Sequence, residues 1–376
     1  MIRTIAAAGG LLGLALAGAA ILATPDARAE TKEINFGIIS TESSQNLRTV
    51  WEPFLADMAR KTGYKINPFF AADYAGVIQA MRFDKVDVAW FGNKSAMEAV
   101  DRAGGEVFAQ TVDKDGNPGY WSLLIVHKDS PIKSLDDILK HPGEYTFGNG
   151  DPNSTSGFLV PTSYIFAANN IDPKTCFKTI RNASHQANAM AVAHKQVAAA
   201  TNNSEDLQRL EATAPDARKE IRIIWTSPII PLDPLMWRKD LDPAVKTKLY
   251  TFLMSYGRIG TAEERDAAKQ VLANLIWSPF HPSSDAQLLP IRILEANKAV
   301  MKIQGDDKMS AADKAAQIAA LQAEIKTYNE QAAKAEAGPF QKRLAHFIEV
   351  DKTADQTELK KLIAEFASAA TAAPTN

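Results

Sequence analysis

Residues 146–157 read T-F-G-N-G-D-P-N-S-T-S-G, and this stretch decides the fold that we predict for the chain. Residues 145–147 are typical of the end of a buried strand, and residues 148–152 of a tight turn. Asn153 suits the N-cap of a helix, because its side chain can accept a backbone N–H. Apolar residues then recur at helical spacing, at Phe158, Leu159, Val160, Tyr164, Ile165 and Phe166.

Three consecutive hydroxyl residues, Ser154, Thr155 and Ser156, would lie on the first turn of that helix. Free backbone N–H groups point out of a helix N-terminus, and the helix dipole favours negative charge there. The hydroxyls add hydrogen-bond donors without adding charge, and Gly157 lets a ligand approach closely. The pattern indicates a pocket for a compact anion with several oxygens. It is equally typical of an ordinary capped helix.

Composition sets limits on the class of protein. The chain has 376 residues, enough for two domains of roughly 100–200 residues each. Its 46% hydrophobic and 23% charged residues are those of an ordinary soluble globular protein. A formal net charge of −2 provides no basic field, so we expect no nucleic-acid partner. Cys176 is the single cysteine, which excludes an intrachain disulfide and argues against a cysteine-based zinc site.

The first 29 residues are predicted to be a signal peptide. Arg3 gives a positive start, residues 5–23 are apolar and small, and Ala27-Arg28-Ala29 matches a cleavage site. The length of the apolar run also suits a transmembrane helix, but the many Ala and Gly residues and the cleavage site favour a cleaved leader. We therefore expect cleavage after Ala29 and an exported protein of the bacterial periplasm.

After the leader, strand and helix patterns alternate. This alternation predicts an α/β fold of parallel sheets with helices on both faces, and ligands bind such folds outside the carboxyl ends of the strands. Residues 226–234 are too rich in proline for a central strand, so we expect them to cross between two lobes. A strand that begins at Tyr120 would be the other crossing. Strands are predicted at residues 34–40, 65–70, 86–91, 120–127 and 221–225.

The C-terminal part is predicted to be helical. Residues 288–301 form one helix, and a short coiled-coil-like seam follows at Ile318, Leu321, Ile325 and Tyr328. The seam falls short of the three to four heptads of a confident coiled coil, so it either packs on its own domain or pairs with another subunit. A last short helix is expected at residues 359–366.

Several long stretches resemble the periplasmic phosphonate-binding proteins of ABC import systems, over about residues 34–292. They include N-F-G-I-I-S-T-E-S (35–43), D-Y-A-G (73–76), M-R-F-D-K-V-D-V-A-W-F-G-N (81–93), F-G-N-G-D-P-N-S-T-S-G-F-L-V-P (147–161), A-T-N-N-S-E-D-L (200–207) and W-S-P-F (277–280). The resemblance implies a two-lobed, type II-like clamshell with two crossovers, which closes on its ligand by hinge motion. The predicted parts are lobe 1 (30–125 and 229–300), lobe 2 (126–228) and a C-terminal helical extension (301–376).

The resemblance also implies a set of ligand-binding residues. The loop that carries Ser154, Thr155 and Ser156, here called the serine loop, would hold the phosphonate oxygens. His185 would add a hydrogen-bond donor. Two tyrosines would close over the ligand, and two acids would face its ammonium group, so 2-aminoethylphosphonate is favoured over simple alkylphosphonates. Phe91 stands where a tyrosine is expected, which removes one hydroxyl near the cleft. The predicted ligand-binding residues are Tyr74, Tyr120, Ser154, Thr155, Ser156, His185, Glu205 and Asp233.

Two other classes of function are weighed against this one. A hydrolase could use Ser154 or Ser156 with His185, but the chain has no G-x-S-x-G elbow and no H-E-x-x-H metal motif. We therefore predict no catalysis, no metal and no cofactor. A receptor of the same fold for phosphate, phosphite or another oxyanion would gain nothing from two acids. The expected partners are a phosphonate, the membrane permease of an ABC transporter and, through the C-terminal helices, a second copy of the chain.

Overall fold

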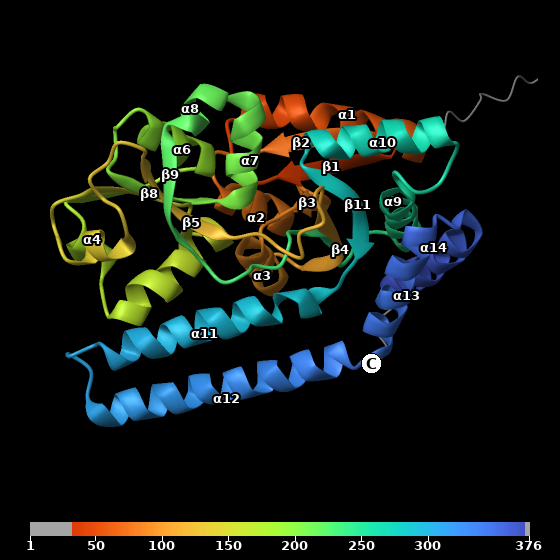
Figure 1. Cartoon of the computed structure of the whole chain (residues 1–376). Helices are drawn as coiled ribbons and strands as arrows, with labels where there is room; N and C mark the ends of the chain where they lie inside the picture. Colours follow the sequence, from red (N-terminus) through yellow and green to blue (C-terminus); the bar gives the residue numbers. More distant parts are fainter. Residues whose placement is uncertain (1–31, 373–376) are drawn as a thin grey trace, which may run out of the picture. The chain divides into compact units, whose positions relative to one another are not determined.

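The computed structural model describes residues 32–372 (Figure 1). The predicted signal peptide, residues 1–29, lies outside the described residues. Within residues 32–372, no helix combines the length and apolar character that crossing a membrane requires. The described chain contains two β-sheets, each covered by helices (Figure 1).

The first sheet has six strands in the order β11-β4-β10-β3-β1-β2. Strand β1 runs parallel to β2 and β3, whereas β10 is antiparallel to both of its neighbours, β3 and β4. The prediction of purely parallel sheets was therefore wrong, because β10 enters this sheet from the other one and reverses direction between β3 and β4. The strands are β1 (Glu33–Ile38), β2 (Lys65–Phe70), β3 (Val88–Trp90), β4 (Gly105–Asp113), β10 (Pro234–Arg238) and β11 (Trp277–Pro282).

The second sheet has five strands in the order β7-β6-β8-β5-β9. Strand β6 is parallel to β7 and β8, and β5 is antiparallel to β8 and β9. This sheet is mixed for the same reason, since β5 enters it from the first sheet. The strands are β5 (Ser122–His127), β6 (Thr146–Asn149), β7 (Thr179–Asn182), β8 (Ala199–Asn203) and β9 (Ile221–Thr226).

Local sequence signals place the helices. Gly63 ends α1 in the left-handed conformation, and Asp73 caps α2 by accepting the Gly76 N–H. The helices around the first sheet are α1 (Ser44–Thr62), α2 (Tyr74–Arg82), α3 (Asn93–Arg102), α9 (Pro243–Ser255), α10 (Ala262–Asn274) and the 3-10 turn η4 (Asp285–Leu288). Those around the second are α4 (Leu135–Leu139), η1 (Thr155–Leu159), η2 (Thr162–Phe166), η3 (Ala167–Asn169), α5 (Pro173–Cys176), α6 (His185–Ala193), α7 (Ser204–Thr213) and α8 (Pro215–Lys219).

Two segments cross between the sheets, and they lie against each other. Tyr120 and Ile230 form an isolated antiparallel bridge, in which each backbone N–H donates to the other residue's carbonyl at 3.0 and 2.8 Å. The fold is thus two-lobed with two crossovers, as predicted. Sequence reasoning missed β10, which begins at Pro234, where the proline-rich crossing ends.

The C-terminal part is helical, as predicted, with α11 (Leu289–Gln304), α12 (Ala311–Glu336), α13 (Pro339–Thr353) and α14 (Gln356–Thr371). Helices α11 and α12 lie side by side along the lower edge of Figure 1. The predicted seam residues are half-buried along α12, which packs on α11 of the same chain. Arg258 anchors α13, because its Nε donates to Asp351 at 2.8 Å while its other nitrogens donate to backbone carbonyls.

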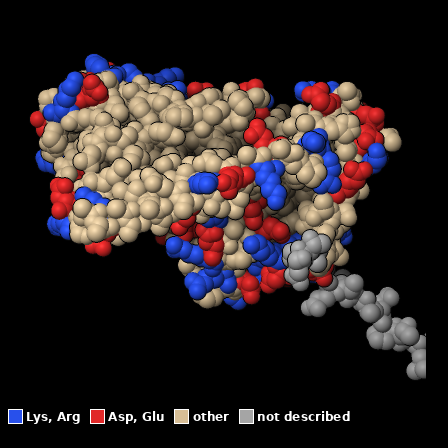
Figure 2. Space-filling model, turned by 90° about the horizontal axis from the view of Figure 1, so that it is seen from below, with Lys and Arg blue, Asp and Glu red and all other residues tan. Residues whose placement is uncertain are grey.

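Charged side chains are mixed on the face seen in Figure 2. Lysine and arginine alternate with aspartate and glutamate in small groups, and a broad area between them carries neither. This agrees with the small net charge of the chain.

Candidate functional site

One small pocket lies where the two lobes and both crossovers meet, and it contains all eight residues that the sequence singled out. In this arrangement the free space is about 10 Å³, roughly the room that one water molecule needs, so the pocket must widen to hold a larger ligand. The first lobe contributes Tyr74, the crossovers contribute Tyr120 and Asp233, and the second lobe contributes the serine loop, His185 and Glu205. The other lining residues are Ile39, Thr41, Trp90, Gly92, Asn203 and Arg209.

The serine loop forms one end of the pocket. Ser154 is the N-cap, since its Oγ accepts the Gly157 N–H at 3.0 Å, and a single π-helical turn begins at Thr155. The prediction of Asn153 as the cap was wrong by one residue, because the Asn153 N–H donates to the side chain of Asp151 and the turn continues. The three buried hydroxyl residues of this turn then line the pocket without any charge of their own.

Two glycines allow this turn to fold tightly. A Cβ on Gly150 would lie 2.5 Å from the backbone of Gly157, and the two backbones are joined by the Gly150 N–H donating to the Gly157 carbonyl at 3.0 Å. Only residues without side chains fit this approach. The glycines therefore set the position of Ser154 to Ser156 relative to the end of β6.

Backbone groups of the first lobe hold the serine loop in the present arrangement. The Lys94 N–H, at the start of α3, donates to Thr155 Oγ1 at 2.8 Å. The Tyr74 N–H, at the start of α2, donates to Asp151 Oδ2 at 3.1 Å. These contacts between lobes describe a closed state, because they bring both lobes against the same loop.

His185 lies between the ends of the serine run. Its Nε2 is 3.4 Å from Ser154 Oγ, 3.5 Å from Ser156 Oγ and 3.1 Å from Asn203 Nδ2. Burial, with a smaller contribution from the positive charge of Arg209, lowers the pKa of His185 to about 3. The imidazole is therefore neutral throughout the physiological pH range.

Two acidic side chains, here called the acidic end, line the same pocket. Glu205 lies on the first turn of α7 and Asp233 on the second crossover, and both are buried. The Tyr120 hydroxyl donates to Asp233 Oδ1 at 3.3 Å, while Glu205 Oε1 is enclosed and lacks a hydrogen-bond partner within residues 32–372. Burial raises the pKa of Glu205 to about 7, and burial together with Glu205 raises the pKa of Asp233 well above its usual value. A cationic ligand group would stabilise both acids in their charged form.

Sequence reasoning missed the ion pair beside these acids. Arg209, one turn after Glu205 on α7, places Nε 2.9 Å from Oε1 of Glu42 in the first lobe. Asp206 lies next to this pair, and burial raises its pKa to about 7. The spacing of Glu205, Asp206 and Arg209 predicts one helix face, but nothing local links that face to Glu42.

A family model described as the periplasmic substrate-binding protein of a phosphonate ABC transporter matches residues 36–288. The chain belongs to this phosphonate-binding family. It is 55% identical over 305 residues to the phosphonates-binding periplasmic protein of Escherichia coli, covering 81% of this chain and 88% of the relative. A crystal structure of the binding component of a phosphonate ABC transporter from Pseudomonas aeruginosa is also 55% identical, with a TM-score of 0.79 over 82% of this chain and all of that one.

More distant relatives differ in what their names say they bind. A phosphate-import protein of Mycolicibacterium smegmatis is 26% identical over 70% of this chain and 84% of its own length. A Prochlorococcus marinus structure in complex with methylphosphonate shares 19% identity and a TM-score of 0.62, over 71% of this chain and 99% of that one. That structure supports the two-lobed fold alone. Membership of the phosphonate-binding family makes this chain a periplasmic receptor of an ABC import system.

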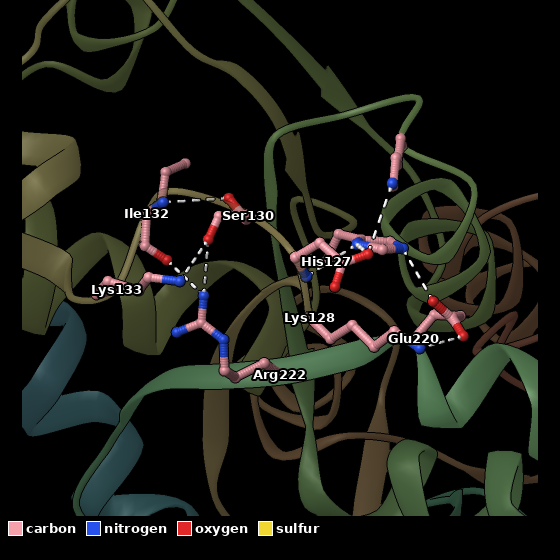
Figure 3. Close-up of polar contacts among 9 residues, drawn as sticks. His127, Lys128, Ser130, Ile132, Lys133, Glu220 and Arg222 are labelled. Carbon is pink, nitrogen blue, oxygen red and sulfur yellow. Dashed lines mark hydrogen bonds and ion pairs between the residues drawn. The ribbon is translucent and has the colours of Figure 1, made fainter.

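The phosphonate-binding fold also carries a group of potential metal ligands away from the pocket, which sequence spacing did not reveal. His127, Asp129 and Glu220 bring ligand atoms within 4.8 Å of one another. The Asp129 N–H donates to His127 Nδ1 at 3.1 Å, and His127 Nε2 lies 3.1 Å from Glu220, so both ring nitrogens already have partners (Figure 3). Lys128 and Lys195 neutralise the two acids. The group is a satisfied ion-pair cluster at the end of β5.

Proposed function

We propose that the protein captures 2-aminoethylphosphonate between its lobes and delivers it to the permease of an ABC importer. The observation that carries this proposal is that two chemically different sets of side chains line one pocket. The hydroxyls of Ser154, Thr155 and Ser156 are neutral donors, and the carboxyls of Glu205 and Asp233 are buried acids. A short zwitterion with an anionic head and an ammonium tail matches both sets at once, since each charge meets groups that compensate it.

Calorimetry with 2-aminoethylphosphonate, ethylphosphonate, phosphate and phosphite tests the proposal. The aminophosphonate should bind most tightly, and ligand-induced shifts in melting temperature should follow the same order. Equal affinity for 2-aminoethylphosphonate and ethylphosphonate would show that Glu205 and Asp233 do not recognise the ligand's ammonium group.

A receptor for phosphate or phosphite is the alternative, and the phosphate-import relative from Mycolicibacterium smegmatis favours it. Such an ion fills the serine-loop end but leaves Glu205 and Asp233 buried without a cation. Burying a carboxylate without a partner is unfavourable, so we expect these ions to bind more weakly. Tighter binding of phosphate than of the aminophosphonate would establish the alternative.

Contacts of His185 argue against hydrolysis. A serine hydrolase needs an acid that orients the second nitrogen of its histidine. Here His185 Nδ1 is buried and has no hydrogen-bond partner within the described residues. We propose that the protein is not an enzyme, and a phosphonate and phosphate-ester hydrolysis assay should show no turnover.

We propose that the lobes, lobe 1 (30–125 and 229–300) and lobe 2 (126–228), close by rotation about the paired crossovers at Tyr120 and Ile230. The hydrogen bonds from Lys94 and Tyr74 to the serine loop join the two lobes, so they must break on opening. Saturating ligand should therefore reduce the radius of gyration measured by small-angle scattering. Identical curves with and without ligand would contradict the clamshell mechanism.

Export and self-association complete the proposal. We expect cleavage of the leader after Ala29, which N-terminal sequencing of the periplasmic protein tests.

A homodimer through the C-terminal helices stays a prediction. The seam side of α12 packs on α11, so a second copy would contact the exposed, alanine-rich side of α12. Light scattering that finds a monomer would end this idea.

A further inference from the structure

The loop that directly follows β1 is held against the second lobe by three contacts. The Ser43 N–H donates to Gln186 Oε1 at 3.1 Å, and the Gln186 N–H donates to the Thr41 carbonyl at 3.3 Å. Between these two contacts, Glu42 Oε1 lies 2.9 Å from Arg209 Nε. Residues 41–43, here called the Thr41 loop, therefore lie against α6 and α7, two helices of the second lobe.

Thr41 itself lines the pocket, and its side-chain hydroxyl is left without a hydrogen bond. The residue is 5% exposed, and its Oγ1 is enclosed and has no partner within residues 32–372. Most buried hydroxyls in folded proteins are hydrogen-bonded, because burying one without a partner is unfavourable. An atom of a ligand bound in the pocket would supply the missing partner.

The contact with Gln186 places Thr41 near the residues that would hold an anion. Gln186 directly follows His185, whose Nε2 lies 3.4 Å from Ser154 Oγ and 3.5 Å from Ser156 Oγ. Since the Thr41 carbonyl accepts the Gln186 N–H, Thr41 lies beside the histidine that contacts the serine loop. The first lobe thus brings a neutral hydroxyl to the pocket in addition to the hydroxyls that the second lobe supplies.

Resting on the proposed phosphonate ligand, we propose that Thr41 Oγ1 donates a hydrogen bond to a phosphonate oxygen. The phosphonate head offers several acceptor lone pairs, and a hydroxyl satisfies one of them without adding a charge. The serine loop and Thr41 would then hold the same head from the two lobes. The head therefore favours the closed state, whatever group is attached to its carbon.

A hydroxyl can also accept, so the ligand's ammonium group is the other partner that could meet Thr41. That group has the carboxyls of Glu205 and Asp233 as acceptors in the same pocket, whereas the phosphonate oxygens require donors. The phosphonate assignment is therefore the one that meets an unfilled need of the ligand. Ligands with and without an amine separate the two assignments.

Calorimetry of Thr41→Val with 2-aminoethylphosphonate and ethylphosphonate tests the proposal. Valine keeps the shape of the side chain and removes the donor, so affinity for both ligands should fall about ten- to a hundred-fold. Thr41→Ser keeps the hydroxyl and should stay within about threefold of the parent protein. Unchanged affinity of Thr41→Val for both ligands would overturn the proposal. Weakening of the aminophosphonate alone would also overturn it, because Thr41 would then contact the ammonium.

Thr111 provides the matched control on β4 of the first lobe. It is buried and its Oγ1 also lacks a hydrogen-bond partner in the described chain, but it does not line the pocket. Thr111→Val makes the same chemical change and should leave affinity for both ligands within about threefold of the parent protein. If Thr111→Val or Thr41→Ser weakened binding as much as Thr41→Val, the loss would reflect packing and the proposal would be wrong. Thr41→Ala, which also lacks the hydroxyl, takes the place of Thr41→Val if the valine variant does not fold.

Failure of the proposed function gives a different result. If 2-aminoethylphosphonate does not bind to the parent protein, the aminophosphonate assignment is wrong. The Thr41 variants are then compared with phosphate, because its oxygens offer the same kind of acceptor. Equal phosphate affinity in Thr41→Val and the parent protein would reject the hydroxyl contact independently.

Discussion

The two ends of the pocket are built in different ways. The serine-loop end comes from one short segment, in which Ser154 caps the turn and Gly157 closes it against Gly150. The acidic end is assembled from α7, the second crossover and the loop after β1, which are far apart in the sequence. Neutral donors can be supplied by local backbone geometry, whereas buried charges need partners from several elements. We therefore expect the acidic end to respond more strongly to single substitutions.

The largest effect is expected at Asp233. In the closed state the ligand's ammonium would be buried against Asp233 and Glu205, and removing one acid leaves a desolvated cation with half of its compensation. Such a loss amounts to on the order of 2–5 kcal/mol, so Asp233→Ala should weaken 2-aminoethylphosphonate binding by roughly 30- to several-thousand-fold. Calorimetry measures the change directly.

Ethylphosphonate provides the control for Asp233. Its apolar tail leaves the acid unpaired in the parent protein, so Asp233→Ala should change its affinity little or improve it. The preference between the two ligands should then narrow or reverse. Equal weakening of both ligands would mean that Asp233 supports the second crossover and does not read the amine.

The serine-loop end should show a smaller effect that is the same for both ligands. Thr155→Val keeps the shape of the side chain, removes its hydroxyl and leaves a ligand oxygen without a donor. Hydrogen bonds to charged groups contribute roughly 1.5–3 kcal/mol, so affinity for each ligand should fall about ten- to a hundred-fold. The change also removes the acceptor of the Lys94 N–H between the lobes. An unchanged dissociation constant would exclude Thr155 from the site.

The difference between the two ends also explains what the sequence could predict. Strand, turn and hydroxyl run are contiguous, so the residues themselves indicated an anion pocket at Ser154 to Ser156. The cap was misplaced by one residue because the Asp151 side chain extends the turn. Glu205 and Asp233 were identified through the resemblance alone, since their meeting depends on the crossover. The Glu42–Arg209 pair was missed because it forms between lobes.

The number of protons taken up on ligand binding should distinguish the acidic end from the serine-loop end, without any comparison of affinities. In the open state Glu205 is expected to have an ordinary pKa near 4.3, whereas burial without an amine raises it to about 7. Closing around ethylphosphonate near pH 6 should therefore take up to one additional proton, shared by Glu205 and Asp233. The stability that this protonation gives to the complex is present at lower pH and is lost as the pH rises through about 7.

The control for this measurement is Glu205→Gln, which cannot take up that proton. Calorimetry in two buffers with different ionisation enthalpies should show less uptake with ethylphosphonate in the variant than in the parent protein. With 2-aminoethylphosphonate the ammonium keeps the acids ionised, so the additional uptake should be absent. Because the parent protein and Glu205→Gln are compared with the same ligand, any proton that the ligand itself gains or loses contributes equally to both and cancels. Equal uptake by both proteins would place the titrating acid elsewhere.

The smallest effect is expected at Phe91, which the resemblance placed near the cleft. In the structure its neighbours Trp90 and Gly92 line the pocket, whereas Phe91 is fully buried in the core of the first lobe. Strand alternation explains this, because successive side chains at the end of β3 point to opposite faces. A hydroxyl added there meets neither the phosphonate nor the amine. Phe91→Tyr should therefore leave the affinity ratio of 2-aminoethylphosphonate to ethylphosphonate within about threefold, below about 0.7 kcal/mol. A larger change by calorimetry would show that Phe91, although it does not line the pocket, influences ligand selectivity. Glu205 and Asp233 would then not determine the preference alone.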